Sequence, residues 1–348
     1  MMIVGIENPL LDISVNVDES FLNRFGLEAN SAILASPDHL PLYDEIKKFP
    51  EVFYSAGGAS QNTIRVAKWM AGPATRAVYI GCVGEDDNQI QMKKSVTDSG
   101  VDPIYQTTPD HPTGTCAVLV NGKNRSLVAN VGAANFLKQS HLENNLNLIL
   151  KSQIIYSSGF LITTSTESLD FISTTLQSLS GRPSSSSRPR FVFNLAAPFL
   201  SQVEVFRTVL MRTIESVDYL FGNDDEARAL SSSLGWGIED VAEIALRLAK
   251  LPKQTDGERT VIITQGPQAT VVTTSSGSAT NHPIRILPEE AIVDTNGAGD
   301  AYAGGFIAGL SLNKPITECC DAGSYAAWEV IQRSGCTLPD QSNFEWSL

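Results

Sequence analysis

Short runs of β-branched and other apolar residues alternate with longer amphipathic segments along most of the chain. These runs predict strands at residues 3–6, 77–83, 154–157, 191–194, 219–221 and 261–264. The segments between them predict helices over residues 59–70, 88–99, 168–179, 224–234, 239–251 and 298–310. Strands that alternate with helices form a parallel sheet covered by helices on both faces. The sequence therefore predicts an α/β protein built on a large, mostly parallel sheet.

Two segments interrupt this alternation and have strand-like patterns of their own. The first spans about residues 13–55, with strands expected at 31–35 and 52–55. In the second, residues 113–130, the dipeptide Asn121-Gly122 lies between two apolar runs and favours a tight hairpin turn. Because an isolated hairpin is not stable, we expect both segments to pair into one small sheet.

This small sheet would form a domain of its own, either as a lid or as a fixed extension of the main sheet. We assign residues 13–55 and 113–130 to the small domain, and residues 1–12, 56–112 and 131–348 to the large one. A Ser-, Pro- and Arg-rich connector at residues 181–190 is typical of a flexible surface loop.

Charge and cysteine content exclude several classes of function. The 348 residues carry 25 Lys and Arg against 38 Asp and Glu, a formal charge of −13, which argues against binding to nucleic acid or an anionic membrane. The five cysteines include no CxxC pair, which suits reduced thiols. No apolar run approaches the length that spans a bilayer. We expect a cytoplasmic protein, with a nuclear pool left open.

The run Asp294-Thr295-Asn296-Gly297-Ala298-Gly299-Asp300 carries the strongest chemical signal. Its glycines leave successive backbone N–H groups free to converge on an anion at the start of a helix, as stabilisation of a phosphoryl group in flight requires. Asp300 would face the arriving nucleophile. The helix N-terminus should lower the pKa of Asp300, so that it is an ionised, weak base at neutral pH. A glycine-rich turn with Asp300 as N-cap is the alternative.

Polar residues also follow the first predicted strand and precede the first predicted helix. Ligands of α/β sheets gather at the carboxyl ends of strands, where Asp12 lies. Its carboxylate suits a vicinal diol such as the 2′ and 3′ hydroxyls of ribose. Gly57 and Gly58 allow close approach of a ligand, and Asn62 can donate and accept hydrogen bonds. Simple turns without a ligand are the alternatives for these positions.

Three further positions suit phosphate and metal chemistry. Arg125 follows the hairpin turn, and its guanidinium matches phosphate oxygens, although exposed arginines are often only solvated. Asn223 and Glu226, three apart at a helix start, can orient the water shell of Mg²⁺ on nucleotide phosphates. The same spacing forms a capping box, and both roles can hold together. The segment Thr264-Gln265-Gly266 ends a strand and either meets the nucleotide or forms a turn.

Together these motifs resemble the ribokinase-like carbohydrate kinase family, and within it the branch that phosphorylates adenosine. The run from Asp294 to Asp300 marks the family. Three segments point to the branch, and the resemblance covers nearly the whole chain: Asn8-Pro9-Leu10-Leu11-Asp12, Asn124-Arg125-Ser126-Leu127 and Asn194-Leu195-Ala196-Ala197-Pro198-Phe199.

The resemblance implies a ribokinase-like large domain with a small β-rich lid, and transfer of the ATP γ-phosphoryl group to the 5′-hydroxyl of adenosine. It implies that Asp300 is the base, that Gly297, Ala298 and Gly299 form the anion hole, and that Arg125 contacts the phosphoryl group. The implied substrate-binding residues are Asn8, Leu10, Asp12, Gly57, Gly58, Asn62, Cys116, Leu127, Phe160, Phe199 and Asn296. The implied ATP-binding residues are Asn194, Asn223, Glu226, Thr264, Gly266, Gly297 and Gly299.

The same resemblance implies Mg²⁺, held by Asn223 and Glu226 through water, and leaves a monovalent cation open as a second cofactor. We expect a monomer whose partners are adenosine and ATP, with neither nucleic acid nor membrane. Three positions depart from the family pattern. Leu161 replaces a second Phe, so that stacking on the base should be weaker or differently arranged; Ser324 replaces a His near the ATP adenine, and Glu7 replaces a small residue.

Two other functions stay open on the sequence alone. A kinase for another nucleoside or a sugar would share the fold, although an aromatic residue in the expected adenine pocket argues against a small sugar. A catalytically silent nucleoside-binding homologue would also share it, although Asp300, Arg125 and the glycine-rich run are all present. A dinucleotide-binding dehydrogenase is disfavoured because no GxGxxG follows the first strand.

Overall fold

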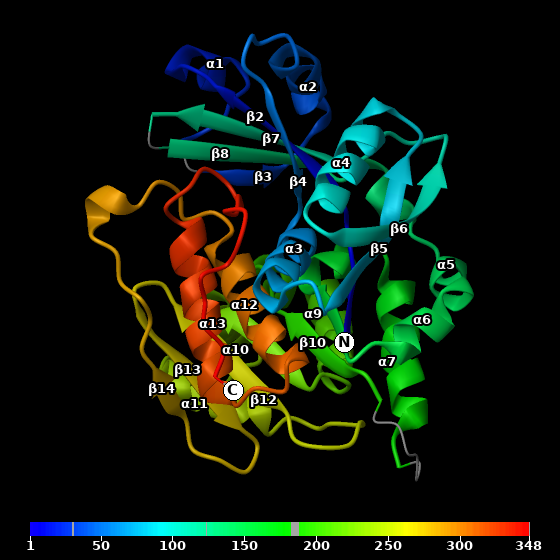
Figure 1. Cartoon of the computed structure of the whole chain (residues 1–348), viewed down its shortest axis with the longest axis vertical. Coiled ribbons are helices and arrows are strands. Elements are labelled where there is room, and N and C mark those ends of the chain that lie inside the picture. Colours follow the sequence, from blue (N-terminus) through cyan, green and yellow to red (C-terminus); the bar gives the residue numbers. More distant parts are fainter. Residues whose placement is uncertain (30, 123, 182–187, 348) are drawn as a thin grey trace.

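A nine-stranded sheet forms the body of the molecule in the computed structural model, which describes residues 1–29, 31–122, 124–181 and 188–347 (Figure 1). Its strands are β1 (Met2–Ile6), β5 (Arg76–Gly84), β6 (Val101–Thr108), β9 (Ile154–Ser158), β10 (Arg190–Asn194), β11 (Tyr219–Asn223), β12 (Thr260–Gln265), β13 (Gln268–Thr274) and β14 (Thr280–His282). Their order is β14-β13-β12-β11-β10-β9-β1-β5-β6. The seven neighbouring strands β12, β11, β10, β9, β1, β5 and β6 pair in parallel. At the other edge, β13 pairs antiparallel with β12, and β14 pairs antiparallel with β13.

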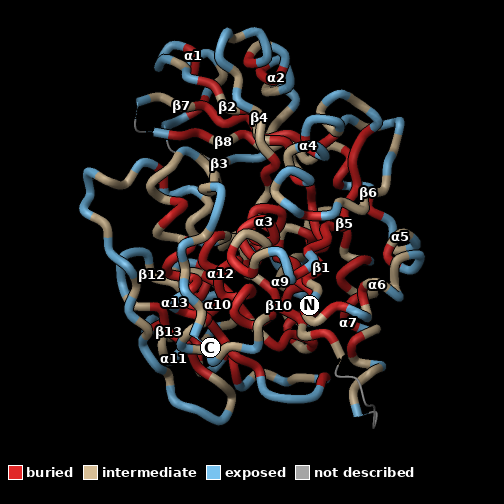
Figure 2. The backbone as a smooth tube through the Cα atoms, in the orientation of Figure 1, coloured by how far each residue is buried: buried red, intermediate tan, exposed pale blue. Residues whose placement is uncertain are grey.

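Helices cover both faces of this sheet, because alternate residues of each strand point to opposite sides. In β1, Ile3 packs with the helices of one face and Val4 with those of the other. The first face carries α3 (Ala59–Ala71), α12 (Ala298–Ser311) and α13 (Ile316–Val330). The second carries α7 (Thr166–Leu179), α9 (Glu204–Ile214), α10 (Asp224–Ser233) and α11 (Val241–Ala249). Figure 2 shows that buried residues concentrate on these inner layers.

Further helical elements occur along the chain. They are α4 (Asp87–Asp98), α5 (Gln139–Asn144), α6 (Leu146–Lys151), α8 (Phe199–Gln202), η1 (Pro37–His39), η2 (Gly132–Phe136), η3 (Gly159–Thr163) and η4 (Glu289–Ala291). None of the helices within the described ranges is long and apolar enough to cross a membrane. The expected connector at residues 181–190 lies outside the described residues over 182–187.

A second sheet lies at one end of the molecule, at the top of Figure 1. Its strands are β2 (Leu10–Asn16), β3 (Ala32–Leu34), β4 (Phe53–Gly57), β7 (Thr115–Asn121) and β8 (Asn124–Asn130), in the order β3-β8-β7-β2-β4. The expected pairing of the two interrupting segments into one sheet is confirmed, as is the β7–β8 hairpin. The first segment also holds two helices that were not expected, α1 (Glu19–Arg24) and α2 (Leu40–Ile46).

The α/β fold class predicted from the alternation is confirmed, and the predicted strands of the main sheet agree with the structure to within two residues. Strands β6, β13 and β14 were not predicted, and β6 contains Pro103, which removes a backbone donor. The structure tolerates this proline because β6 is at the edge of the sheet. Strands β2 and β4 run across the expected domain boundaries at 12/13 and 55/56, so the division into a large domain and a lid stays a prediction.

Candidate active site

Several strands of the main sheet end at one edge, because parallel strands present their carboxyl ends together. A cavity of about 110 Å³ opens there. It is lined by Ala59, Ser158, Phe160, Asn194, Ala196, Phe221, Gly222, Asn223, Glu226, Thr264, Gly299 and Asp300. The structure thus brings together residues from the ends of β9, β10, β11 and β12 with the first turns of α3, α10 and α12. The volume of this cavity suits a phosphoryl-sized group rather than a whole nucleotide.

The first turn of α12 presents backbone donors at this cavity. Gly297, the N-cap, has φ +79°, a conformation that side chains rarely adopt. The Ala298 N–H already donates to Thr295 O at 3.2 Å, so this member of the expected anion hole is engaged within the turn. The N–H groups of Gly299 and Asp300 have no hydrogen-bond partner among the described residues. These two amides are therefore available to an anion, as helix N-termini generally are.

Close packing of two helices sets the position of Asp300. A Cβ atom added to Gly304 of α12 would lie 2.7 Å from Thr63 O of α3, so only glycine lets the two helices approach this closely. As a result Asn62, in the first turns of α3, donates from Nδ2 to Asp300 Oδ2 at 3.3 Å. The expected pair of Asn62 and Asp300 is therefore brought into contact, although the two residues are 238 positions apart.

The expectation of a lowered pKa for Asp300 is wrong. Burial, with smaller contributions from the carboxylates of Glu7, Asp12 and Glu226, raises the pKa of Asp300 to about 8 against the hydrogen bond from Asn62. The effect of the helix N-terminus is smaller than the cost of holding several carboxylates in one poorly solvated site. In the absence of ligands Asp300 is thus largely protonated at neutral pH, which the sequence did not indicate.

Besides Glu226 of α10, the carboxylates near Asp300 are Glu7, which follows β1, and Asp12 of β2. Asp12 lies directly over Gly57, since a Cβ atom at Gly57 would fall 2.0 Å from Asp12 Oδ1. Burial raises the pKa of Asp12 to about 7, and the charge of Arg65 opposes that rise. Glu7 is 2% exposed and accepts a hydrogen bond from Ser158 N at 2.9 Å. Burial raises the pKa of Glu7 to about 7 against this hydrogen bond.

Arg125 of β8 is buried at the junction of the two sheets, not solvated. Its Nε lies 2.9 Å from Asp294 Oδ2, and its Nη2 donates to Ser334 Oγ at 2.8 Å. Asp294 also accepts from Asn296 N at 3.0 Å and from Gly335 N at 2.8 Å. Arg125 therefore joins the small sheet to the loop that precedes α12, and it does not line the 110 Å³ cavity.

Asn223 and Glu226 form the expected capping box at the start of α10. Glu226 N donates to Asn223 Oδ1 at 2.8 Å, and the Glu226 carboxylate accepts from Asn223 N at 3.0 Å and Nδ2 at 2.9 Å. In the described ranges no group of three or more His, Cys, Asp and Glu side chains could hold a metal. One carboxylate beside a phosphate-sized cavity fits Mg²⁺, which keeps several waters and binds through one or two carboxylates plus substrate phosphates.

Several expected binding residues lie outside this cavity. Leu10, Cys116 and Leu127 belong to the small sheet, and Phe199 packs on Phe206 with ring centroids 6.1 Å apart. Gly58 precedes α3, Asn296 precedes α12 and Gly266 follows β12. None of these three residues lines the cavity. Asn8 supports the Phe160 turn, because its Nδ2 donates to Phe160 O at 3.3 Å and its Oδ1 accepts from Thr164 Oγ1 at 2.8 Å. Their substrate contacts stay predictions.

The departures from the family pattern have structural settings of their own. Leu161 belongs to η3 and is fully buried in the core on the second face of the main sheet, and it does not line the cavity. Ser324 Oγ accepts from Arg285 N at 2.7 Å.

Three residues of the site were missed by the sequence analysis. Ser158 ends a predicted strand, so the carboxyl-end rule could have found it. Arg65 is three residues after Asn62 on the same helix face, a spacing that places side chains together. Glu7 was noted only as a departure from the family pattern, and the sequence offered no reason for it, because its role depends on burial beside Ser158.

Comparisons with known proteins give consistent results. The profile of the pfkB family carbohydrate kinases matches residues 24–343. Adenosine kinase 2 of Arabidopsis thaliana is 43% identical over 346 residues, which cover 99% of this chain and 97% of that protein. Adenosine kinase of Dictyostelium discoideum is 40% identical over 335 residues, 95% of each chain. The structure of Anopheles gambiae adenosine kinase in complex with P1,P4-di(adenosine-5) tetraphosphate is similar with a TM-score of 0.87, 40% identity and 98% of each chain covered.

Proposed function

The chain belongs to the pfkB family of carbohydrate kinases, and from this premise we propose that it is an adenosine kinase, which converts ATP and adenosine into ADP and AMP. One observation carries the proposal for the site. Asp300 and the two available N–H groups of Gly299 and Asp300 lie in one cavity at the carboxyl ends of the parallel strands. The cavity combines a proton acceptor with an anion cradle, which are the parts that phosphoryl transfer to an alcohol needs.

In the proposed reaction the adenosine 5′-oxygen attacks the γ-phosphorus of ATP. The bond between that oxygen and phosphorus forms, the bond from phosphorus to the β,γ-bridging oxygen breaks, and ADP leaves. The hydroxyl proton passes to the Asp300 carboxylate. The N–H groups of Gly299 and Asp300 donate to the oxygens of the phosphoryl group in transfer, where fixed donors are most effective. Asn62 holds the Asp300 carboxylate toward the cavity.

The acceptor ribose is proposed to lie over Gly57 and Asp12. The carboxylate of Asp12 has no ion pair among the described residues, so its oxygens are available to the 2′ and 3′ hydroxyls. The base is proposed to contact Leu10, Cys116, Leu127, Phe160 and Phe199, as the family resemblance implies. In the Anopheles complex the ligand carries two adenosine groups joined by four phosphates. A ligand of that composition would fill both an acceptor and a donor position in this chain.

Mg²⁺ is proposed as the cofactor of the donor phosphates. When bound, it neutralises phosphate charge and withdraws electrons from the group in transfer. Glu226 and Asn223 would hold it through water, because their side chains already satisfy each other in the capping box. We further propose that Asn194 and Thr264 contact the nucleotide, and that the protein acts in purine salvage in the cytoplasm as a monomer.

A panel of nucleosides and sugars tests the proposal. The purified chain, ATP and Mg²⁺ are incubated with each acceptor, and the products are identified by mass spectrometry. Adenosine should give AMP and ADP in equal amounts, at a higher kcat/KM than any sugar. Asp300→Asn should still bind adenosine but lose about 10²–10⁴-fold in kcat. Preference for a free sugar would overturn the substrate assignment, and a silent homologue would phosphorylate none of the acceptors.

A further inference from the structure

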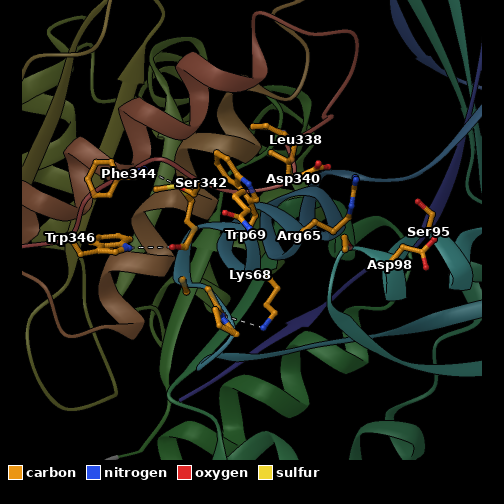
Figure 3. A pocket seen from close by; sticks show the side chains of 17 residues that line it. Arg65, Lys68, Trp69, Ser95, Asp98, Leu338, Asp340, Ser342, Phe344 and Trp346 are labelled. Carbon is orange, nitrogen blue, oxygen red and sulfur yellow. Dashed lines mark hydrogen bonds between the residues drawn. The ribbon is translucent and has the colours of Figure 1, made fainter.

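Arg65 of α3 is a buried cation on the protein side of the candidate site. It is 8% exposed, and its Nη1 donates to Ala56 O at 2.7 Å, Asn62 Oδ1 at 3.3 Å and Cys336 O at 3.4 Å. Figure 3 shows Arg65 and Lys68 from α3 at a groove of about 900 Å³ between α3, the end of α4 and residues 338–346. Arg65 therefore lies between this groove and the residues that hold Asp300.

The contact with Arg65 fixes the orientation of the Asn62 side-chain amide, whose oxygen and NH₂ ends have nearly the same shape. A guanidinium has only donors, so the atom of Asn62 that meets Arg65 must be the carbonyl oxygen. The amide NH₂ of Asn62 then faces the other way, where it donates to Asp300 Oδ2 at 3.3 Å. With the amide reversed, its oxygen would face Asp300, and the ionised carboxylate, which has no donor, would lose this hydrogen bond. Arg65 thus determines which atom Asp300 meets.

The other two acceptors of Arg65, the carbonyls of Ala56 and Cys336, lie next to other residues of the same site. Cys336, whose carbonyl accepts from Arg65, packs behind Gly297: a Cβ atom at Gly297 would lie 3.2 Å from Cys336 Cβ. Ala56 immediately precedes Gly57, which lies under Asp12. By contrast Arg259, which is 1% exposed, donates only to backbone carbonyls such as Leu248 O and Ile214 O, as a structural arginine does.

We propose that Arg65 is a positioning residue for phosphoryl transfer, which holds the Asn62 amide so that it donates to the Asp300 carboxylate. The inference rests on the proposed function of Asp300 as the base. It assigns a role to a residue that does not contact substrate, and it predicts that Arg65 acts on the reaction through Asn62.

A double-mutant cycle tests this coupling. Arg65→Met should lower kcat about tenfold to a hundredfold, the range expected for losing a hydrogen bond to a charged group, with a smaller change in the KM for adenosine. In the Asn62→Ala background the same substitution should lower kcat no further. Arg65→Lys keeps a cationic donor for Asn62 Oδ1 and should retain most of the activity. Rates are taken per folded enzyme, from thermal unfolding of each variant.

The pH profile separates positioning from a structural role. Since the Asn62 hydrogen bond favours the ionised form of Asp300, Arg65→Met and Asn62→Ala should both move the midpoint of kcat against pH upward. A loss of folded protein alone would leave that midpoint in place. The other titratable groups that face Asp300 are unchanged in these variants: Glu7, Asp12, Tyr156, Glu226 and Cys336.

Lys68→Met is the matched control. Lys68 lies three residues along the same helix and lines the same groove, but within the described part of the chain its Nζ donates only to Gly72 O at 3.2 Å and Thr75 O at 2.8 Å. This variant should keep the wild-type kcat and pH midpoint. If Arg65→Met does not fold, Arg65→Gln replaces it in the cycle, because a glutamine amide can both donate and accept and no longer dictates the Asn62 orientation.

Unchanged kcat in Arg65→Met, or losses that add fully in the Asn62→Ala background, would overturn the inference. A wild-type enzyme that phosphorylates no nucleoside would instead refute the proposed function. The two failures are therefore distinguishable in the same set of assays.

Discussion

Raising the pH from 7 to 9 should increase kcat/KM of the enzyme about tenfold. Burial and the neighbouring carboxylates raise the pKa of Asp300 to about 8 in the absence of ligands. A base acts only when ionised, so about a tenth of the enzyme is competent at pH 7 and about nine tenths at pH 9. The sign follows from the direction of the shift: activity is gained as the pH rises through 8.

The assay measures initial rates at subsaturating adenosine and ATP, with AMP quantified by mass spectrometry so that no coupling enzyme adds its own pH dependence. Under these conditions kcat/KM reports groups of the free enzyme. Glu7→Gln removes one of the charges that raise the pKa of Asp300, so its midpoint should lie below that of the wild type. Far-ultraviolet circular dichroism at each pH serves as the control for folding. A rate that is flat between pH 7 and 9 in folded enzyme would refute the assigned cause.

Three further outcomes are expected. Gly57→Ala would place a Cβ atom 2.0 Å from Asp12 Oδ1, so it should raise the KM for adenosine about tenfold or more, and an unchanged KM would remove Asp12 from the ribose site. A Cβ atom at Gly299 would have no described atom within 4 Å outside its own helix turn, so Gly299→Ala should gain about 0.5–1 kcal/mol in denaturant unfolding. Gly299 lines the cavity, so the added methyl should hinder an anion there and lower kcat about tenfold or more; equal activity would contradict the anion cradle. The pKa of Asp300 is about 8 in the folded protein, against its ordinary value of 3.8. The stability that comes from this difference is complete below about pH 4 and is lost as the pH rises through 8. The Tm of Asp300→Asn relative to wild type should therefore rise between pH 6 and 9, and a constant difference would speak against the raised pKa.

The positions of the site residues could be predicted better than their ionisation. Asn223 and Thr264 were expected at a ligand site because they lie at a helix start and a strand end, Asp300 because of the glycine-rich run before it, and Asn194 through the family resemblance; all four line the cavity. The rule that parallel strands share a carboxyl edge then placed them together. The raised pKa of Asp300 could not be predicted in this way, because it depends on burial and on charges from residues far apart in the sequence.

Arg125 shows the same limit. Its place on a hairpin of the small sheet was expected, and an exposed or phosphate-binding side chain followed from that place. The structure instead buries the guanidinium against Asp294, in the same run of residues that forms the start of α12. Arg125 and Asp294 each belong to a motif that can be recognised in the sequence. Their pairing depends on how the small sheet packs against the loop before α12.

The charge arrangement of the site has a consistent physical reason. Glu7, Asp12, Glu226 and Asp300 form no ion pair among the residues that the structure describes. Each has a raised pKa, with burial as the largest cause. An ion pair at any of them would hold the carboxylate ionised, but it would also occupy the oxygens that a substrate hydroxyl needs. The charge of Arg65 favours the ionised form of Asp12 without forming an ion pair with it, since the guanidinium donates to Asn62 and to backbone carbonyls. The guanidinium of Arg65 thus lies on the protein side of the site. The acceptor atoms of Asp12 and Asp300 stay available on the side where substrate would bind.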